Sequence, residues 1–400
     1  MKVPKGWKVK SLGGLTAWKS GGTPSKNNPE FWNGNIPWIS ASSMHCYDFF
    51  YSDLRITEKG LKSGSKLAKK GSLLLLVRGS MLWKKVPIGI ASVDVAFNQD
   101  VKALEVNNEI IPEYLLYWFL SHENVLLHKV VGTGMGAGKL DTDMMKSILV
   151  SYPPISEQKA IADTLVTWDQ VIEKTEKLIE LKEKRFKWLL NELIPKKAKK
   201  EGWKEVRLGD ICEIKKGNGL SKEDTSIDGS NKCILYGELY TTYPQIINIV
   251  VSKTNIREGV LSKSGDILVP GSTTTTGIDL ANATALLEND ILLGGDINIL
   301  RPKKVNIYDP IFLAYYLTFN KKHEIASFAQ GITIVHLYGK DLLKISILLP
   351  KLSFQKTVKD IFIISQEEID NLKTQIEKYK TQKQGLMQKL LTGKWRVKVK

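Results

Sequence analysis

The sequence predicts two mixed α/β (α+β) domains in tandem, joined by two long helices that form an antiparallel coiled coil with pseudo-twofold symmetry. Three observations predict this fold. The chain of 400 residues exceeds the usual size of one domain. Short motifs recur once along it, and each half closes with a long amphipathic helix. We expect a first domain at 1–155, a central helix at 156–194, a second domain at 195–352, and a C-terminal helix with its tail at 353–400.

The internal repeat rests on four motifs that recur in the same order, at offsets within a few residues of 196. A single match of this kind has little weight, but four matches in one order indicate two halves of one ancestral unit. The pairs are Gly6-Trp7-Lys8 with Gly202-Trp203-Lys204, Lys69–Leu74 with Lys263–Leu268, Pro112–Tyr117 with Pro310–Tyr315, and Pro153, Ser156, Gln158 with Pro350, Ser353, Gln355.

Inside each half, short β-rich runs are broken by Gly, Pro, Asn and Ser, which is typical of strands joined by turns. The clearest runs are Ser72–Val77 and Ile267–Val269. One apolar helix is expected in each half, at Pro112–Leu120 and Pro310–Thr318, with proline at the favoured first turn. Trp7 and Trp203, at the start of each repeat, are interpreted as packing anchors.

The closing helices follow Pro153-Pro154 and Pro350, with Ser156 and Ser353 as expected N-caps. The first is expected to stop at Pro195, before the exposed linker Lys196–Lys200, and the second near Leu391, before Gly393. Apolar residues at spacings of four and three predict that the helices pair with each other. The alternative is that each packs on its own domain. The predicted coiled-coil residues are Ile161, Leu165, Trp168, Ile172, Ile179, Phe186 and Leu189, with Val358, Phe362, Ile369, Leu372, Ile376, Tyr379 and Leu386.

Composition favours a polyanionic partner. Lys and Arg total 58 against 42 Asp and Glu, a formal charge of +16. The three cysteines form no CxxC pair, which argues against a disulfide framework or a zinc ribbon and fits a reducing cytoplasm. The charged N-terminus is no signal peptide, and no apolar run reaches the roughly 20 residues of a membrane span.

No catalytic constellation stands out, so we expect a chain that is not an enzyme and holds no metal or cofactor. The glycine-rich run Gly132–Lys139 fits only a relaxed dinucleotide pattern without a βαβ unit, and it does not fit a P-loop. We interpret it as a flexible loop at a DNA or protein surface. The histidines lack metal-ligand spacing.

The polar turns are typical of a DNA reader. Hydroxyls and amides suit base edges, arginine suits guanine, and lysine suits phosphate. Where the first half has Arg78, the second has Pro270, which predicts that the halves read different sequences. Solvated loops are the alternative for each residue. The candidates are Ser40, Ser42, Ser43, His45, Lys62, Lys66, Arg78, Ser80, Lys84, Lys85, Asn98 and Gln99, then Tyr236, Glu238, Tyr240, Thr241, Thr242, Ser272, Thr273, Thr274 and Thr275.

Several motifs of the sequence match those of a known family, and the resemblance covers essentially the whole chain. The sequence resembles the DNA-specificity (S) subunit of type I restriction–modification systems. The motifs that carry the resemblance are Pro4–Lys8, Gly21-Gly22-Thr23-Pro24-Ser25, Ile36-Pro37-Trp38-Ile39, Asn98-Gln99-Asp100 and Pro153–Ile161. The second half departs from the family pattern at Lys216–Leu220 and at Phe354, where Glu is usual.

The resemblance implies two target-recognition domains, each reading one part of a bipartite asymmetric DNA site, and helices that set the gap between the parts. It implies partners: double-stranded DNA, two modification subunits that bind S-adenosylmethionine and methylate adenine, and a motor-nuclease restriction subunit. Two alternatives stay open. One is a basic coiled-coil scaffold without sequence preference, and the other is a nucleic-acid enzyme with an unrecognised site.

Overall fold

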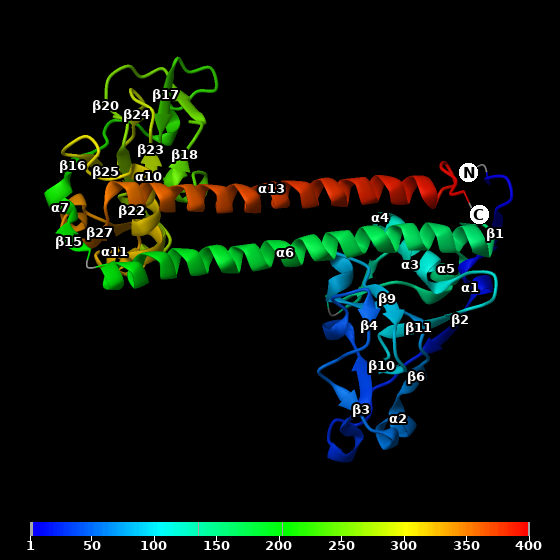
Figure 1. Ribbon diagram of the computed structural model, residues 1–400. Helices are drawn as coiled ribbons and strands as arrows, with labels where there is room; N and C mark the ends of the chain where they lie inside the picture. Colours follow the sequence, from blue (N-terminus) through cyan, green and yellow to red (C-terminus); the bar gives the residue numbers. More distant parts are fainter. Residues whose placement is uncertain (1–2, 135, 202, 399–400) are drawn as a thin grey trace. The chain divides into compact units, whose positions relative to one another are not determined.

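The computed structural model describes residues 3–134, 136–201 and 203–398, and for residues 195–200 the backbone only. Met135, Gly202 and the side chains of Lys196–Lys200 therefore lie outside it. The chain divides into two compact units (Figure 1). Unit 1 comprises Met1–Glu176 with Thr374–Lys400, and unit 2 comprises Lys177–Lys373. Each long helix contributes one part to each unit.

Unit 1 is built on two larger sheets, of five and four strands, and two small ones. The five-stranded sheet has the order β2 (Thr16–Ser20), β11 (Val101–Val106), β7 (Leu73–Leu76), β9 (Ile88–Ala91), β4 (Asp48–Phe49), and the four-stranded sheet has the order β5 (Arg55–Ile56), β3 (Trp32–Ile39), β10 (Val95–Phe97), β6 (Lys66–Ala68). One small sheet pairs β1 (Lys8–Ser11) with β14 (Leu149–Tyr152). The other, the edge sheet, has the order β12 (Val131–Gly132), β13 (Gly138–Lys139), β8 (Arg78–Gly79). The short helices are α1 (Leu12–Leu15), α2 (Glu58–Gly64), α3 (Pro112–Ser121), α4 (Glu123–Leu127) and α5 (Thr142–Ser147), with 3₁₀ turns η1 (Pro29–Phe31), η2 (Ala41–Ser43) and η3 (Ser80–Trp83).

Unit 2 repeats the five-stranded sheet, the four-stranded sheet and one two-stranded sheet in the same strand order, but its edge sheet has two strands where that of unit 1 has three. The five-stranded sheet has the order β16 (Cys212–Lys216), β25 (Ile297–Pro302), β21 (Asp266–Pro270), β23 (Thr284–Leu286), β18 (Ile246–Ile247), and the four-stranded sheet has the order β19 (Ser252–Thr254), β17 (Asn231–Ile234), β24 (Leu292–Leu293), β20 (Val260–Leu261). One small sheet pairs β15 (Lys204–Arg207) with β27 (Ser346–Leu349), and the edge sheet pairs β22 (Ser272–Thr273) with β26 (Val335–His336). Its helices are α7 (Leu208–Ile211), α8 (Glu238–Thr241), α9 (Gly277–Leu280), α10 (Pro310–Tyr315), α11 (Lys322–Ser327) and α12 (Gly339–Leu342), with η4 (Lys222–Asp224) and the π-helix η5 (Tyr316–Asn320).

The register confirms the tandem repeat. In the five-stranded sheets, Leu104 pairs with Leu73 in unit 1 and Leu300 pairs with Ile267 in unit 2. The predicted β-runs are strands β7 and β21, and both predicted helices begin at their proline. The predicted class, two mixed α/β domains in tandem, is therefore confirmed by the topology.

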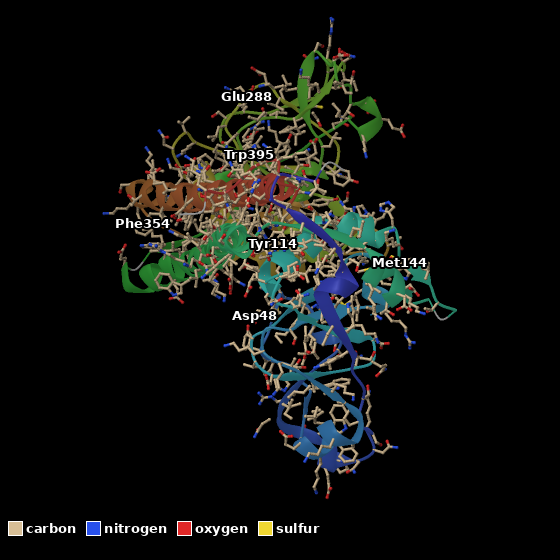
Figure 2. All side chains as sticks on the ribbon, turned by 90° about the vertical axis from the view of Figure 1, so that its right-hand side faces the viewer. Asp48, Tyr114, Met144, Glu288, Phe354 and Trp395 are labelled. Carbon is tan, nitrogen blue, oxygen red and sulfur yellow. The ribbon has the colours of Figure 1, made fainter. Side chains whose placement is uncertain are left out.

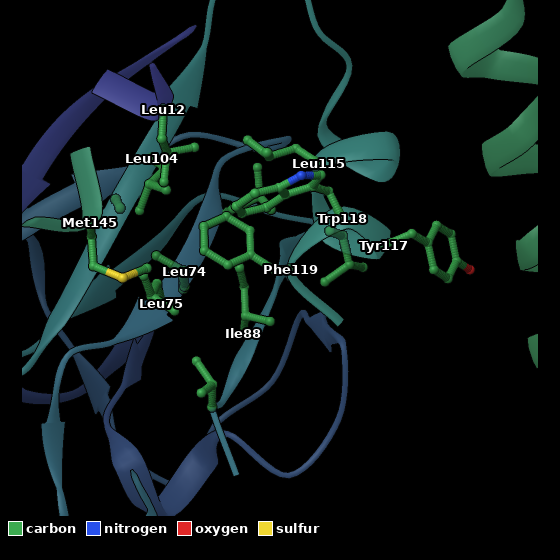
Figure 3. Packing of buried hydrophobic residues seen from close by; sticks show 14 of the residues in the cluster. Leu12, Leu74, Leu75, Ile88, Leu104, Leu115, Tyr117, Trp118, Phe119 and Met145 are labelled. Atoms are coloured by element: carbon green, nitrogen blue, oxygen red, sulfur yellow. The ribbon is translucent and has the colours of Figure 1, made fainter. Parts of the chain in front are cut away.

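The core of each unit lies between its five-stranded sheet and the apolar helix. In unit 1, residues 114–119 of α3 are all buried, because α3 packs between the sheet and α6. Figure 3 shows Trp118 and Phe119 against Leu74 and Leu75, while Tyr117 points away from this cluster. Tyr114 of the same helix, labelled in Figure 2, is also fully buried.

The recurring glutamine of each closing motif locks the start of its helix. The Gln158 side chain donates to the carbonyl of Pro153 at 2.8 Å and accepts from the amide of Ile111 at 2.9 Å. Gln355 does the same with Pro350 and the amide of Asp309, both at 2.8 Å. Both glutamines are buried, so this pairing explains why the motif occurs in both halves.

The long helices are α6 (Ile155–Glu201) and α13 (Leu352–Leu390). Two details of the prediction were wrong. Ser156 and Ser353 lie inside the first turn instead of capping it. The backbone of helix α6 also continues past Pro195 to Glu201, so the helix does not end where the sequence predicted. The end of α13 before Gly393, which has φ +67°, is as predicted.

The coiled coil is confirmed, and its ion pairs show that the helices run antiparallel. In unit 1, Glu176 pairs with Lys380 at 3.1 Å and Asp169 pairs with Lys383. In unit 2, Glu183 pairs with Lys373 at 2.6 Å, and the Phe186 and Phe362 rings lie 6.0 Å apart. Every predicted coiled-coil residue is buried or half-buried. Each helix also packs on a domain core: Ile161 and Leu165 lie in the core of unit 1 with Leu390, and Val358 lies in that of unit 2.

The C-terminal tail is tied to the start of α6 within unit 1. Arg396 donates from Nε and Nη2 to both carboxylate oxygens of the buried Glu157, at 2.6 and 2.7 Å, and from Nη1 to the carbonyl of Lys5. The second half has Phe354 at the position of Glu157, and its ring packs on Trp203 with centroids 5.0 Å apart. The departure from the family pattern thus replaces an ion pair by an aromatic contact.

Candidate nucleic-acid interface

A small sheet at one edge of unit 1 brings together two cations. Strand β13 places Lys139 opposite Arg78 of β8 and Gly138 opposite Gly79. A Cβ at Gly138 would lie 2.8 Å from Val130 and 3.0 Å from Leu82, so this close approach requires glycine. Arg78 and Lys139 are both exposed. The edge therefore presents charges of the kind that bind phosphates and guanine edges.

The matching edge of unit 2 has different chemistry. Strand β22 places Ser272 opposite His336 of β26. The main chain shows the equivalence, because Leu140 donates to Val77 and Leu337 donates to Gly271, both at 2.8 Å. The counterpart of Arg78 is therefore Ser272.

The sequence comparison, which placed Pro270 at the position of Arg78, was wrong by two residues. Pro270 pairs with Ile297 inside the five-stranded sheet, as Leu76 pairs with Val101 in unit 1. Such short strands have no periodic pattern that fixes their register, whereas the pairing in the folded sheet does. The conclusion that the two halves differ at this edge remains.

The glycine-rich run begins in β12 and ends in β13, which pair antiparallel, so it does not lead into a helix as a phosphate loop does. Trp83 of η3 donates from Nε1 to the carbonyl of Gly136 at 3.0 Å, and a Cβ at Gly132 would lie 3.8 Å from its ring. Trp83 is 52% exposed. The other candidates of this segment lie beside it, with Ser80 and Lys84 exposed and Lys85 half-buried.

The serine run of the first half is only partly available to DNA. Ser42 and His45 are exposed, and Ser40 is half-buried with its hydroxyl 2.9 Å from that of Ser42. Ser43 hydrogen bonds with the buried Ser52, whose hydroxyl donates to the carbonyl of Trp38. We therefore assign Ser43 to the framework of unit 1 and keep the others as interface candidates.

Asn98 is a structural residue in this fold. It is buried, and its Oδ1 accepts from the amides of Asp100 and Val101, both at 3.1 Å. The neighbouring Gln99 is exposed and accepts a hydrogen bond from Thr23 at 2.8 Å. Lys62 and Lys66 are also exposed.

The candidates at 236–242 of unit 2 surround the short helix α8. Glu238 accepts from the amide of Leu235 at 2.8 Å and from Ser252, so its carboxylate holds the turn together. Tyr236 and Tyr240 are half-buried, while Thr241 and Thr242 are exposed with their hydroxyls 3.2 Å apart. The two threonines are the exposed members of this group.

The hydroxyl run at 272–275 separates into two parts. Ser272 and Thr273 are buried, with 4% and 2% of their surface exposed. Thr274 and Thr275 are exposed, and Thr275 donates to Asp279 at 2.6 Å. Thr274 is thus the residue of this run that is best placed for contact.

Two acidic residues next to the edge sheets were not singled out from the sequence. Asp100 pairs with Nε of Arg78 at 3.2 Å. Asp296 pairs with Lys216 at 3.1 Å and accepts from Ser272 at 2.9 Å. Burial opposes ionisation of Asp296, but the bonds from Lys216 and Ser272 outweigh it and lower the pKa of this carboxyl.

Lys139 and Lys216, the cations of these edges, were also missed by sequence reasoning. Lys139 is the last residue of the glycine-rich run, directly after Gly138, and Lys216 ends strand β16 directly before Gly217. A lysine beside a glycine at a strand end is the signal that could have found both. Lys102, beside Asp100, has its pKa lowered chiefly by burial and donates to Ser20 at 2.7 Å.

Among the described residues, no group of three or more His, Cys, Asp or Glu side chains is arranged to hold a metal ion. In the same part of the chain, no helix has the length and apolar character that crossing a membrane requires. Cys46 is exposed, and Cys212 and Cys233 are buried with free thiols.

Comparison with known proteins decides the family. The model of the type I restriction modification DNA specificity domain matches residues 4–183 and again 200–384. The chain belongs to this family. Each match coincides with one of the repeated halves, so the two domains of the family member have a DNA-recognition role.

Individual relatives agree with this assignment. The specificity subunit of type I restriction enzyme MjaIX from Methanocaldococcus jannaschii is 26% identical, with 99% of this chain and 95% of that protein aligned. The EcoR124I/EcoR124II specificity subunit from Escherichia coli is 34% identical over 45% of this chain and 46% of that protein.

Solved structures share the fold. The S subunit of a type I system from M. genitalium has a TM-score of 0.58 at 18% identity and covers 98% of both chains. The HsdS subunit from Thermoanaerobacter tengcongensis has a TM-score of 0.51 at 17% identity and covers 99% of both.

Proposed function

We propose that this chain is the non-catalytic DNA-reading and scaffold subunit of a type I restriction–modification complex in the cytoplasm. Unit 1 reads one part of a bipartite asymmetric site and unit 2 reads the other, while the paired helices set the number of base pairs between them. The proposal rests on one observation: the two units have the same fold but different side chains at the equivalent edge sheet. These are Arg78 and Lys139 in unit 1, and Ser272 and His336 in unit 2.

The charge of the chain supports a DNA partner. The formal charge is +16, and the exposed cations Arg78, Lys139 and Lys216 belong to strand edges that face solvent. Lysine and arginine bind phosphates without regard to sequence, and arginine also recognises guanine in the major groove. Different side chains on one frame give different base preferences, as an asymmetric target requires.

The outer face of the helix pair is the proposed docking surface for two modification subunits. Within unit 2, Leu181 and Trp188 of α6 are 52% and 57% exposed, and Ile364 of α13 is 64% exposed. A groove of about 230 Å³ between the helices includes Ile361 and Ile364 in its lining. Exposed apolar side chains at helical spacing favour a partner helix that covers them.

A binding selection tests the proposal. The chain, assembled with its modification subunits, is incubated with random duplexes, and the bound fraction is sequenced at a stated salt concentration. We expect one gapped motif with two different halves. Equal binding of all sequences, with a steep salt dependence, would instead identify a nonspecific scaffold. Turnover of DNA by the purified chain alone would identify an enzyme.

A further inference from the structure

Asp100 and Asp296 occupy the same place in the two units. The carbonyl of Asp100 accepts from the amide of Val77 at 2.9 Å, and that of Asp296 accepts from Gly271 at 2.6 Å. Val77 and Gly271 directly precede β8 and β22, the edge strands. Each carboxylate therefore lies beside the surface that is proposed to read DNA.

The cation paired with each acid comes from a different strand. Asp100 holds Arg78 of β8 at 3.2 Å, and Asp296 holds Lys216 of β16 at 3.1 Å. The counterpart of Lys216 is Ser20, because these residues pair with Asn298 and Lys102 at equivalent positions. Both units thus have an aspartate at this position. Its cationic partner comes from β8 on one side of the aspartate in unit 1 and from β16 on the other side in unit 2.

The backbone of unit 2 shows that aspartate at 296 has a cost. Asp296 has φ +56°, a left-handed conformation that glycine adopts without strain. Gly294 and Gly295 stand directly before it. A side chain at this position is unfavourable for the backbone, so what aspartate contributes is its carboxylate.

A carboxylate on a DNA-binding surface repels phosphates, so it needs a compensating role. An ion pair restricts a long cationic side chain before DNA arrives, which reduces the entropy lost on binding. Arg78 and Lys216 remain exposed although they are paired with Asp100 and Asp296, with 55% and 67% of their side-chain surface accessible. Both types of cation bind the O6 and N7 atoms of guanine.

We infer that Asp100 and Asp296 are positioning residues, which aim Arg78 and Lys216 at base edges in the first and second half of the target. This inference rests on the proposed function. It assigns Lys216 as a specificity residue of unit 2. The two units then share an aspartate at the same position, but the cation that it positions differs in type and comes from a different strand.

The test compares Asp100→Asn and Asp296→Asn in the chain assembled with its modification subunits. The readout is the set of sequences methylated in a random duplex library. We expect Asp100→Asn to lower discrimination roughly three- to tenfold at one base position of the first half only, and Asp296→Asn to do so in the second half only. Combining each with Arg78→Gln or Lys216→Gln is expected to add little, because acid and cation act as one unit.

Matched controls separate positioning from the loss of any acid. Asp94→Asn removes an exposed ion pair with Lys69 in unit 1, and Asp290→Asn changes an exposed aspartate with φ +62° in unit 2. Neither control is expected to change the motif. Equal loss on all sequences, or unchanged discrimination by both test variants, would overturn the inference. If the unaltered complex yields no two-part motif, the proposed function itself fails.

Discussion

Phe362 joins the C-terminal helix α13 to the core of unit 2. Its truncation to alanine measures how much this contact contributes to the stability of unit 2. The side chain is fully buried, with its ring centroid 5.1 Å from that of Tyr315 and 6.0 Å from that of Phe186. These three rings come from α13, α10 and α6. The contact therefore connects both long helices to the apolar helix of one unit.

We expect Phe362→Ala to destabilise unit 2 by about 3–5 kcal/mol, from lost burial and the cavity that remains. For a domain of this size, each kcal/mol lowers Tm by about 2–4 °C, so the transition of unit 2 is expected to fall by about 6–20 °C. Scanning calorimetry measures the transitions. Ile364→Ala is the matched control, because Ile364 lies two residues further along α13 and is 64% exposed. A loss below about 1 kcal/mol, or an equal loss in both variants, would refute this packing account.

Three further predictions concern the interface and the helices. Arg78→Ala is expected to cost about 1–3 kcal/mol at one base position of the first half and to relax specificity there, measured by competition binding; an equal loss on all sequences would make Arg78 a phosphate contact. A paired insertion adds seven residues after Glu176 and seven before Lys380, two residues that pair at 3.1 Å. It preserves the heptads and lengthens the helix pair by about 10 Å, so the gap in the methylated motif should lengthen by about three base pairs. An unchanged gap would contradict the proposal that the helices set the spacing. Trp188→Glu, at an exposed apolar position, should abolish co-purification of modification subunits while leaving the unfolding temperature unchanged, with Lys187→Glu as the control; retained co-purification would exclude this face as the docking surface.

Long-range regularities of the sequence predicted the architecture. The repeat and the spacing of apolar residues in the long helices extend over many residues, so single errors do not alter the result. The proline at the start of α3 and of α10 is a similarly direct signal, because proline is favoured at the first position of a helix. The less direct signals failed: Ser156 and Ser353 lie inside their helices, and Pro195 does not end α6.

The exposure and pairing of the candidate residues could not be predicted from the sequence, because both are decided by contacts distant in the chain. Asn98 resembles an adenine reader in isolation, yet its side chain satisfies two backbone amides. Ser272 belongs to a polar run, yet it is buried against Asp296. Lys216 lies 80 residues before Asp296 in the chain, and only the folded sheet brings them together.

The central claim is that each unit reads one part of a gapped target. A base-resolution map of adenine methylation in the host genome, with the gene intact and deleted, tests it most directly. The account predicts that deletion removes methylation from one motif with two different parts separated by a fixed gap. A methylation pattern that does not change, or the loss of one continuous motif, would contradict it.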